Sequence, residues 1–420
     1  MADKSIIDQH GRTYAPLDNA FVQNLDGYFE ALRREAPVCY SPDNDLWLVS
    51  RYEDIMTVLK DPLTYSSAHS IAPFDAVPAQ VESILSEGLP RTRMLMGEEP
   101  ERHRLLRPAV RSAFSTRRVA SMERSIAELA GELVDSFVDA GGADIISQFA
   151  YPLPMTVITD LLGVPRADRA KVKAGHDHTI AALFSGPIPL DQRLHAAHGS
   201  VEYQRYLLSL INDRRTAPRD DFVTDLVNAT DGNGDRLDDA ELVWLMFLMI
   251  SGGHETTSSM IGTTLWLLLN DQAQYQKVLA QPDQIAPALE EMLRHTNPLL
   301  TLRRTTTRQV ELAGVSIPAQ AHLGLLHGSG NLDERIYSEP SRFDISRTTV
   351  GRPHLSFGHG IHFCVGAHLA RLEGKVALEV LLNRLPRLRL GSNSKPTFQP
   401  HPLFHSLTRL EVAWDAERAR

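Results

Sequence analysis

One short segment near the C-terminus constrains the fold and chemistry of this chain more than any other. Residues 357–366 read F-G-H-G-I-H-F-C-V-G, and the pattern of 365–384 predicts a helix directly after the cysteine, Cys364. Glycine allows a backbone to turn sharply and to lie close against a flat ligand. The free N–H groups at a helix start favour the thiolate form of cysteine, which is the form that binds metals. The segment therefore predicts a ligand loop supported by a helix.

The composition of the chain argues against several function classes. The 420 residues carry a net charge of -9, are 43% hydrophobic and contain two cysteines, Cys39 and Cys364. These values fit an ordinary globular core that is large enough to enclose a cofactor. The negative charge argues against binding of nucleic acid. Because two cysteines are too few for a disulfide framework, we expect a reducing, cytoplasmic setting and a packed core thiol at Cys39.

The hydrophobic pattern does not predict attachment to a membrane. The N-terminal segment lacks the apolar core of a signal peptide, and the most apolar run, 242–253, ends at His254 and Glu255. A helix that spans a bilayer needs about 20 consecutive, mainly apolar residues, so this run is too short. We therefore expect no membrane partner.

The residue periodicity predicts a mainly α protein with a small β part, folded as a single domain over residues 1–420. A turn at 230–237 and a capping Asp238 or Asp239 predict a very long helix that ends near Asn270. Further helices are expected at 24–35, 52–60, within 100–162 with an interruption at Pro152 and Pro154, twice within 167–214, and at 271–280, 283–295 and 365–384. Strands are expected at 47–50 and within 309–326, a hairpin at 397–414, and a long loop with one short helix at 64–98.

The cysteine segment resembles the haem-ligand loop of the cytochrome P-450 family, and of its soluble bacterial haem-thiolate monooxygenases in particular. The family pattern F-x-x-G-x-H-x-C-x-G falls on Phe357, Gly360, His362, Cys364 and Gly366. The resemblance implies that Cys364 is the axial ligand of the iron of haem b. It also implies that Phe357 and Gly366 shelter the sulfur, that Gly358 contacts the cofactor, and that His362 reaches a haem propionate. A thiolate is the strongly donating ligand that favours cleavage of an O–O bond.

Two other interpretations of this segment stay open from the residues alone. A cysteine after glycines is often only a small buried side chain. Zinc is the second alternative, because four nitrogen or sulfur donors lie within a few residues of one another: His359, His362, Cys364 and His368. Their spacing does not match the common zinc-binding patterns.

The middle of the long helix carries a second motif, S-G-G-H-E-T-T at 251–257. Two glycines inside a helix cost about 2 kcal/mol relative to alanine, so a function should compensate for them. The family's oxygen-activation motif, [AG]-G-x-[DE]-T, matches Gly252, Gly253, Glu255 and Thr256. An acid beside an alcohol can relay protons through water to a reacting centre. The resemblance therefore implies that Glu255 and Thr256 deliver protons, as in a monooxygenase rather than a dedicated peroxygenase.

Charged motifs elsewhere support the same resemblance. Glu291 and Arg294 form E-x-x-R on one helix face, and Arg342 lies in a P-S-R-F segment that resembles the family's meander. The resemblance assigns Glu291, Arg294 and Arg342 to a structural network. It also places the haem between the long helix, 238–270, and the helix after the cysteine, 365–384.

Basic residues are expected to bind the haem propionates. His103 and Arg107 resemble the family's propionate clamp, and a planar guanidinium suits a carboxylate. Arg304 occupies the position of another propionate ligand in the family, although its neighbour Arg303 is an alternative.

The substrate pocket is inferred from the positions of substrate contacts in the family. Those positions hold Phe74, Phe184, Leu248, Ser251, Leu299, Leu300 and Phe404. The set predicts a largely apolar small organic substrate. Each apolar member is also readily explained as buried core, because burial is the default for such residues.

The motifs span residues 99–371 and together imply a monooxygenase that inserts one atom of O2 into its substrate, by hydroxylation or a related oxidation, in secondary metabolism or catabolism. Electrons are expected from a separate ferredoxin and ferredoxin reductase, because no fused reductase is evident in the chain. A basic patch for an acidic ferredoxin is expected from Arg104, Arg107, Arg111, Arg117, Arg118, Arg371 and Lys375. Two alternatives keep the haem: another tailoring reaction, such as coupling or nitration, and a non-catalytic haem-thiolate sensor.

Overall fold

The computed structural model describes residues 4–73, 75–184, 186, 188–230, 234–348, 351–392 and 396–418. Contacts divide the chain into two compact units. The first unit consists of Met1–Ser66, Thr116–Pro154 and Glu255–Arg420, and the second of Ser67–Ser115 and Met155–His254. The longest helix, α14 (Asp239–Asn270), runs from the second unit into the first. The predicted class, mainly α with a small β part, is confirmed.

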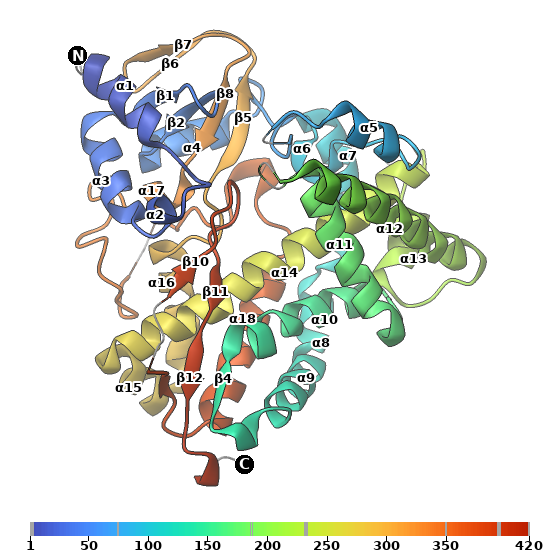
Figure 1. Cartoon of the computed structure of the whole chain (residues 1–420), viewed down its shortest axis with the longest axis vertical. Helices are drawn as coiled ribbons and strands as arrows, with labels where there is room; N and C mark the ends of the chain where they lie inside the picture. The colour runs from blue at the N-terminus through green and yellow to red at the C-terminus, as the bar shows by residue number, and fades with distance from the viewer. Residues whose placement is uncertain are drawn as a thin grey trace. The chain divides into compact units, whose positions relative to one another are not determined.

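All strands of the described residues belong to the first unit (Figure 1). They are β1 (Val38–Ser41), β2 (Leu46–Val49), β3 (Tyr65–Ser66), β4 (Gly142–Asp144), β5 (Leu302–Thr306), β6 (Val310–Leu312), β7 (Val315–Ile317), β8 (His322–Leu325), β9 (Arg389–Leu390), β10 (Thr397–Phe398), β11 (Leu407–Arg409) and β12 (Glu411–Ala413). The helices of this unit, besides its part of α14, are α1 (Lys4–Thr13), α2 (Asn19–Val22), α3 (Leu25–Glu35), α4 (Tyr52–Lys60), α8 (Thr116–Ser121), α9 (Glu123–Asp135), α15 (Gln272–Ala280), α16 (Ile285–His295), α17 (His327–Asn331) and α18 (Ala367–Arg384).

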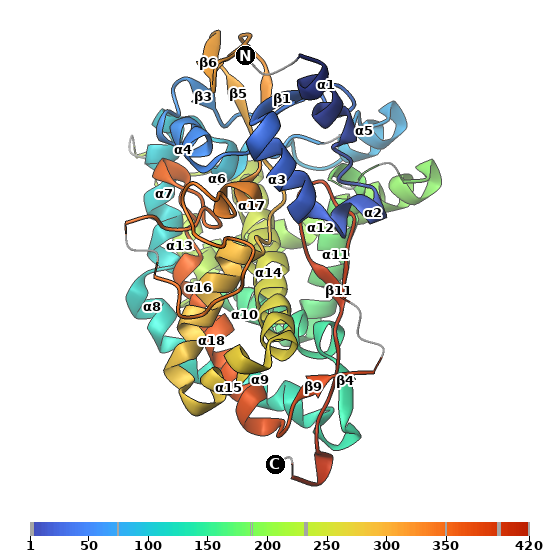
Figure 2. The same cartoon turned by 90° about the vertical axis from the view of Figure 1, so that its left-hand side faces the viewer.

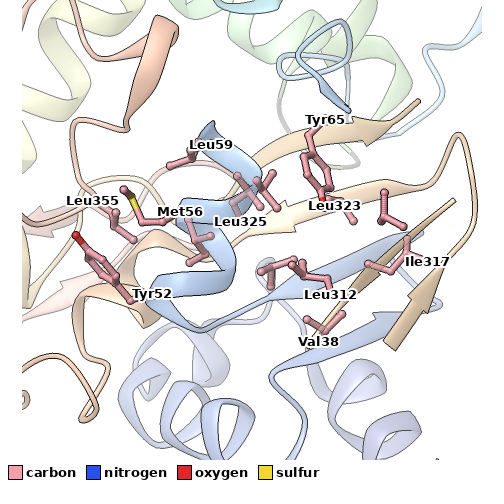
Figure 3. Packing of buried hydrophobic residues seen from close by; sticks show 14 of the residues in the cluster. Val38, Tyr52, Met56, Leu59, Tyr65, Leu312, Ile317, Leu323, Leu325 and Leu355 are labelled. Atoms are coloured by element: carbon pink, nitrogen blue, oxygen red, sulfur yellow. The ribbon is translucent and has the colours of Figure 1, made fainter. Parts of the chain in front are cut away.

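The largest sheet has the strand order β1-β2-β8-β5-β3. Strands β2 and β8 pair in parallel, and the other neighbours pair antiparallel. Because side chains alternate along a strand, Leu323 and Leu325 of β8 point to one face, where they share a core cluster with Ile55 and Leu59 from α4. Figure 3 labels Leu59, Leu323 and Leu325 in this cluster. Ile55 and Leu59 are four residues apart, so α4 presents both to the sheet.

Helix α18 packs against several helices of the first unit. Helix α18 contacts α9 and α16, and the two views show it beside them (Figures 1 and 2). Gly374 in α18 makes this close packing possible. A Cβ atom at Gly374 would lie only 2.7 Å from Met260 Cε and 2.9 Å from Leu289 Cδ2. Helix α18 is therefore fixed directly behind the cysteine loop that precedes it.

The second unit is helical. Its helices are α5 (Ala79–Leu85), α6 (Met94–Gly97), α7 (Pro100–Ala113), α11 (Arg169–Leu183), α12 (Leu190–Thr216), α13 (Phe222–Asn228) and most of α10 (Pro152–Leu161). Helices α11 and α12 pack against each other, and Gly175 leaves room for the ring of Tyr203. A buried ion pair joins Arg214 Nε to Asp221 Oδ2 at 2.6 Å and fixes the end of α12.

Most predicted elements are confirmed, and α14 begins with the predicted cap. The Asp238 side chain accepts a hydrogen bond from the N–H of Glu241 (2.8 Å), and the Glu241 carboxylate accepts one from the N–H of Asp238 (3.0 Å). This reciprocal pair is a capping box, which satisfies two donors at the helix start. The predicted separation of α11 and α12 at 185–189 is also observed, although Ser185 and Pro187 lie outside the described residues.

Other predictions of local structure were wrong. The interruption predicted at Pro152 and Pro154 lies at Tyr151, just before α10, but Pro154 falls inside α10, because the first turn of a helix needs no backbone N–H from proline. The 64–98 loop contains two short helices, α5 and α6, in place of one. In the tail, β10 pairs with β11, but β12 pairs with β4 and β9, so 397–414 is not a simple hairpin. Strand β5 was not predicted, because Arg303 and Arg304 obscure its apolar alternation.

Candidate functional site

The cysteine loop, residues 357–366, is closed by its own backbone. The N–H of Cys364 donates to the carbonyl oxygen of Phe357 at 2.9 Å. Gly358 and Gly360 have φ values of 70° and 71°, a left-handed conformation that favours glycine. A Cβ atom at Gly360 would lie 2.8 Å from the carbonyl oxygen of Leu59, so α4 also requires glycine there. Two glycines therefore fix the turn that presents the cysteine.

The exposed face of this loop is apolar around the thiol. Cys364 is exposed, and the large apolar side chains of Ile361 and Phe363, close to it in the same loop, are 37% and 41% exposed. Gly366 is the N-cap of α18, so the cysteine lies just before the helix N-terminus, where partial positive charge favours a thiolate. The loop thus presents a sulfur within an apolar surface.

A clamp behind the loop holds Phe357. The guanidinium of Arg371 lies 4.4 Å from the centre of the Phe357 ring and donates two hydrogen bonds to Glu290, at 2.6 and 2.9 Å. His354 Nε2 lies 3.2 Å from the same carboxylate. Burial raises the pKa of Glu290, but the bonds to His354 and Arg371 outweigh burial and lower the pKa to about 2. Glu290 is therefore ionised at neutral pH and anchors the start of the loop.

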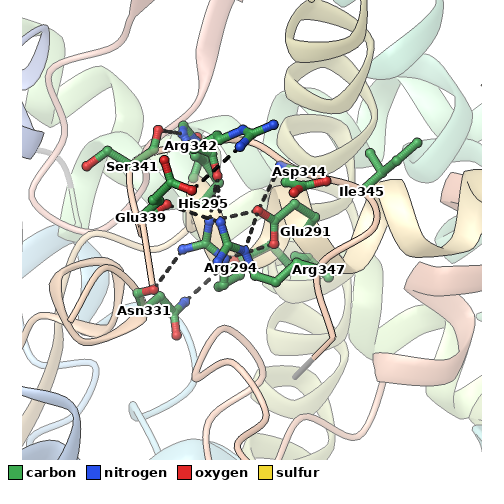
Figure 4. Close-up of polar contacts among 12 residues, drawn as sticks. Glu291, Arg294, His295, Asn331, Glu339, Ser341, Arg342, Asp344, Ile345 and Arg347 are labelled. Carbon is green, nitrogen blue, oxygen red and sulfur yellow. Dashed lines mark hydrogen bonds and ion pairs between the residues drawn. The ribbon is translucent and has the colours of Figure 1, made fainter. Parts of the chain in front are cut away.

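The Glu291 network, which consists of Glu291, Arg294 and Arg347, supports the loop from below. Arg294 donates two hydrogen bonds of 2.8 Å to the Glu291 carboxylate, and Arg347 donates one of 3.0 Å (Figure 4). Arg294 also donates to the carbonyl oxygen of Asn331 at 3.0 Å. The Asn331 side chain bonds the N–H of Leu355 and the hydroxyl of Ser356, directly before the cysteine loop.

The prediction that Arg342 completes this network was wrong. Arg342 is largely exposed and pairs with Glu339 at 3.5 Å, and only its backbone carbonyl accepts bonds from Arg294 and Arg347. Arg347, whose side chain is 11% exposed, provides the third guanidinium. The sequence offered both arginines within five residues of each other, and the P-S-R-F match directed the choice to the first.

In the middle of α14, the two adjacent glycines Gly252 and Gly253 have different surroundings. A Cβ atom added to Gly252 would meet no heavy atom of the described residues within 4 Å. A Cβ atom at Gly253 would lie 2.8 Å from Cγ1 of Ile158, so this glycine is required by packing within the second unit. Glu255 and Thr256, in the first unit, are both half-buried on the same helix. Gly252 therefore borders open space, whereas Gly253 is required by close packing against Ile158.

The basic residues predicted at the haem propionates lie on well-defined elements. In the first unit, Arg304 lies on β5 and is 6% exposed. The burial of His327 and the nearby charge of Arg304 together lower the pKa of His327 to about 3. Arg303 points to the other face of β5, where its charge acts on Tyr14. His362 is half-buried in the cysteine loop.

In the second unit, His103 and Arg107 lie one turn apart on α7, so they share a helix face. His103 is 3% exposed. Burial and the neighbouring charge of Arg107 lower the pKa of His103 to about 4. The imidazole is therefore neutral at pH 7 and suited to hydrogen bonding rather than to ion pairing.

The predicted substrate residues are distributed over both units. In the first, Leu299 forms a β-bridge with Phe404, and Leu299 and Leu300 border a cavity of about 190 Å³. Leu300 is 3% exposed and packs in a core cluster. In the second unit, Phe184 and Leu248 are buried, Ser251 is half-buried, and the Phe184 ring stacks on Phe247. Phe74 lies outside the described residues.

Two further observations bear on the zinc alternative and on the role predicted for Cys39. Within the described parts of the chain, no three His, Cys, Asp or Glu side chains gather as they would around a metal ion, so the zinc interpretation gains no support. Cys39 is buried in β1, and burial raises the pKa of its thiol to about 12, which confirms the predicted core thiol.

No helix of the described residues combines the length and the apolar character that crossing a bilayer requires.

Comparisons with known proteins give a consistent result. The family model described as Cytochrome P450 matches residues 187–408. The chain is 35% identical over 380 residues to 6-deoxyerythronolide B hydroxylase of Saccharopolyspora erythraea, and this match covers 88% of this chain and 91% of that protein. It is 34% identical over 386 residues to Cytochrome P450 107B1 of the same organism, with 90% and 91% covered. A solved structure, cytochrome P450 CREJ in complex with (4-ethylphenyl) dihydrogen phosphate, matches with a TM-score of 0.90 at 30% identity, over 96% of this chain and 100% of that one.

Proposed function

This chain belongs to the cytochrome P450 family of haem b monooxygenases, and on that basis we propose that Cys364 is the thiolate ligand of its haem. The observation that carries the proposal is the exposed sulfur of Cys364 within an apolar surface that includes Ile361 and Phe363. A flat, apolar macrocycle would cover this surface and remove it from water. Gly358 and Gly360 keep the nearby backbone free of side chains that would obstruct a close approach.

Polar groups of the chain fit the charged edge of a haem. We assign the propionates to Arg304 and His362 of the first unit and to His103 and Arg107 of the second. The guanidinium of Arg304 is buried, and a carboxylate matches its planar geometry. Arg303 is the weaker candidate, because it points to the opposite face of β5.

When bound, the haem supplies the centre at which O2 is bound and activated. The residues of the chain then have to provide protons and exclude water. We assign proton delivery to the Thr256 hydroxyl and the Glu255 carboxylate, which are adjacent and half-buried on α14. Gly252 leaves open space on this helix, and Gly253 holds the helix in place through its packing on Ile158.

We propose that the substrate is a small and largely apolar organic molecule that is hydroxylated. The predicted contacts offer aromatic and aliphatic surface, Phe184 and Leu248 in the second unit and Leu299 and Phe404 in the first. A similar solved structure holds an aryl phosphate, and a similar curated protein is named a hydroxylase, so both names are compatible with this class. A different tailoring reaction, such as coupling or nitration, remains the alternative for product analysis.

We further propose that electrons come from a separate ferredoxin and its reductase and that the protein acts in the cytoplasm. Some cations expected to attract an acidic ferredoxin are already paired: Arg371 with Glu290, and Lys375 with Glu123 and Glu379. Arg117, which is exposed on α8, is the better candidate in the first unit.

The experiment that tests the function is turnover under ¹⁸O2 with a ferredoxin and reductase, on a substrate found by its effect on the haem spin state. We expect one labelled oxygen atom in the product. Thr256→Ala should lower the product formed per electron by at least about tenfold, because a positioned proton donor contributes roughly 10²–10⁴-fold. Thr257→Ala, a buried neighbour on α14, is the matched control and should keep wild-type coupling. Product that contains oxygen only from water would contradict the proposal.

A further inference from the structure

The C-terminal segment 401–406 is fixed against the loop after α16. The N–H of Leu300 donates to the carbonyl oxygen of Leu403 at 2.7 Å, and the N–H of His405 donates to that of Pro298 at 2.8 Å. Leu299 and Phe404 form a β-bridge between the same two segments. The segment is therefore an ordered part of the first unit.

The same segment is tied to the face of α14 that carries Glu255. The Ser259 hydroxyl donates to the carbonyl oxygen of His405 at 2.9 Å. Ser259 lies four residues after Glu255, and residues four apart share one face of a helix. The hydrogen bond therefore aligns the 401–406 segment with the helix face on which Glu255 lies.

His401 is held in one tautomer within this segment. It is 8% exposed, and its Nδ1 accepts hydrogen bonds from the N–H groups of Leu403 (3.0 Å) and Phe404 (3.1 Å). An acceptor nitrogen carries no proton, so in the neutral ring the proton is on Nε2. Burial lowers the pKa of His401 to about 4, against the opposing effect of the Glu255 charge. The ring is therefore a neutral Nε2–H donor at pH 7.

The Nε2 atom of His401 is buried and has no hydrogen-bond partner among the residues that the structure describes. Burial of a donor without a partner is costly, and such groups in folded proteins usually serve a ligand, a water or a function. Glu255 is the charged group whose field acts on this ring. A half-buried carboxylate is a strong acceptor for such a donor.

We propose that His401 is a positioning residue for Glu255, whose carboxylate accepts the hydrogen bond of His401 Nε2–H through one bridging water molecule. This inference rests on the proposed proton-delivery role of Glu255. The bond keeps the carboxylate ionised and oriented between proton transfers, and His401 itself neither gains nor loses a proton.

Two substitutions separate this role from support of the loop. His401→Asn keeps an acceptor near the position of Nδ1 for the N–H groups of Leu403 and Phe404, but it has no donor that reaches the place of Nε2. His401→Gln places an amide N–H near the position of Nε2 and gives up the short acceptor. We expect product per electron to fall about tenfold in His401→Asn and to recover to within about twofold of wild type in His401→Gln, since proton delivery depends on a positioned donor.

The second readout does not depend on turnover. In the carbon monoxide complex of the reduced protein, ¹⁵N labelling of histidine should show His401 as the Nε2–H tautomer, with its signal assigned by its loss in His401→Asn. Glu255→Gln should shift this signal, whereas Glu311→Gln, an exposed change on β6, should not.

The outcomes are distinct from those that test the function. Unchanged coupling in His401→Asn, or a His401 signal that does not respond to Glu255→Gln, would overturn the inference. If coupling falls in both His401 variants together with the midpoint of thermal unfolding, the residue is structural and the inference also fails. Failure of the proposed function would instead appear in the wild-type protein, as unlabelled product or as haem without a thiolate ligand.

Discussion

The cysteine loop and the Glu291 network lie in the same unit, but they are built in opposite ways. Arg294 and Glu291 are 1% and 4% exposed, and protein groups satisfy their charges. In the loop, Cys364 and Phe363 are exposed, although the backbone beneath them is fixed by Gly358 and Gly360. The difference indicates that the network stabilises the fold, whereas the loop presents the thiol of Cys364 and apolar surface to a ligand.

Asn331 connects these two regions. Its backbone carbonyl oxygen accepts a hydrogen bond from Arg294. Its side chain accepts one from the N–H of Leu355 and donates one to the hydroxyl of Ser356, directly before the loop. Changes in the network should therefore affect both stability and the loop, whereas a change of the thiol should affect the ligand alone.

The largest effect on stability is expected from Arg294→Leu. This change leaves the buried Glu291 carboxylate without its bidentate partner, and loss of one member of a buried ion pair costs about 3–5 kcal/mol. Urea unfolding monitored by circular dichroism would measure the loss. A change below about 1 kcal/mol would mean that the network does not carry the stability assigned to it.

A smaller effect should distinguish Arg347 from Arg342. Arg347→Gln removes bonds to Glu291 and to three backbone carbonyls, and we expect a loss of about 1–3 kcal/mol. Arg342→Gln, at an exposed side chain, should change the free energy of unfolding by less than about 0.5 kcal/mol. Equal losses of unfolding free energy in the two variants would mean that the Arg342 side chain does contribute to the network.

A smaller effect than that of Arg347→Gln should come from Glu290, and it should depend on pH. Because the pKa of Glu290 falls from 4.5 to about 2 on folding, its contribution is present above about pH 4.5 and is lost as pH decreases toward 2. The side chain is 43% exposed, so solvent screening limits the contribution to about 1 kcal/mol or less. The difference in unfolding free energy between wild type and Glu290→Gln should therefore shrink between about pH 6 and pH 3. A difference that does not change with pH would contradict the proposed clamp on Phe357.

The sequence predicted those features that depend on local patterns. The cap at Asp238, the extent of α14, and the helix after Cys364 follow from side-chain chemistry within a few residues, and the structure contains all of them. Pairings between distant segments were not predictable in this way. The partners of β12 and the bond from Ser259 to His405 depend on where the chain returns in space.

Choices between neighbouring residues were the hardest to make from the sequence. Arg342 and Arg347 both fit the expected charge, and only burial separates them. The alternation of β5 places the side chains of Arg303 and Arg304 on opposite faces, and that strand was itself not predicted. A motif fixes a residue type at a position in the chain, but it does not fix which of two adjacent side chains points inward.

The absorption spectrum of the dithionite-reduced protein under carbon monoxide tests the assignment of Cys364 most directly. Wild type should give the far red-shifted Soret band of thiolate-ligated haem. Cys364→Ala should lose that band, and the matched change of the buried core thiol, Cys39→Ala, should keep it. A band that survives in Cys364→Ala, or a wild-type band typical of histidine-ligated haem, would contradict the account.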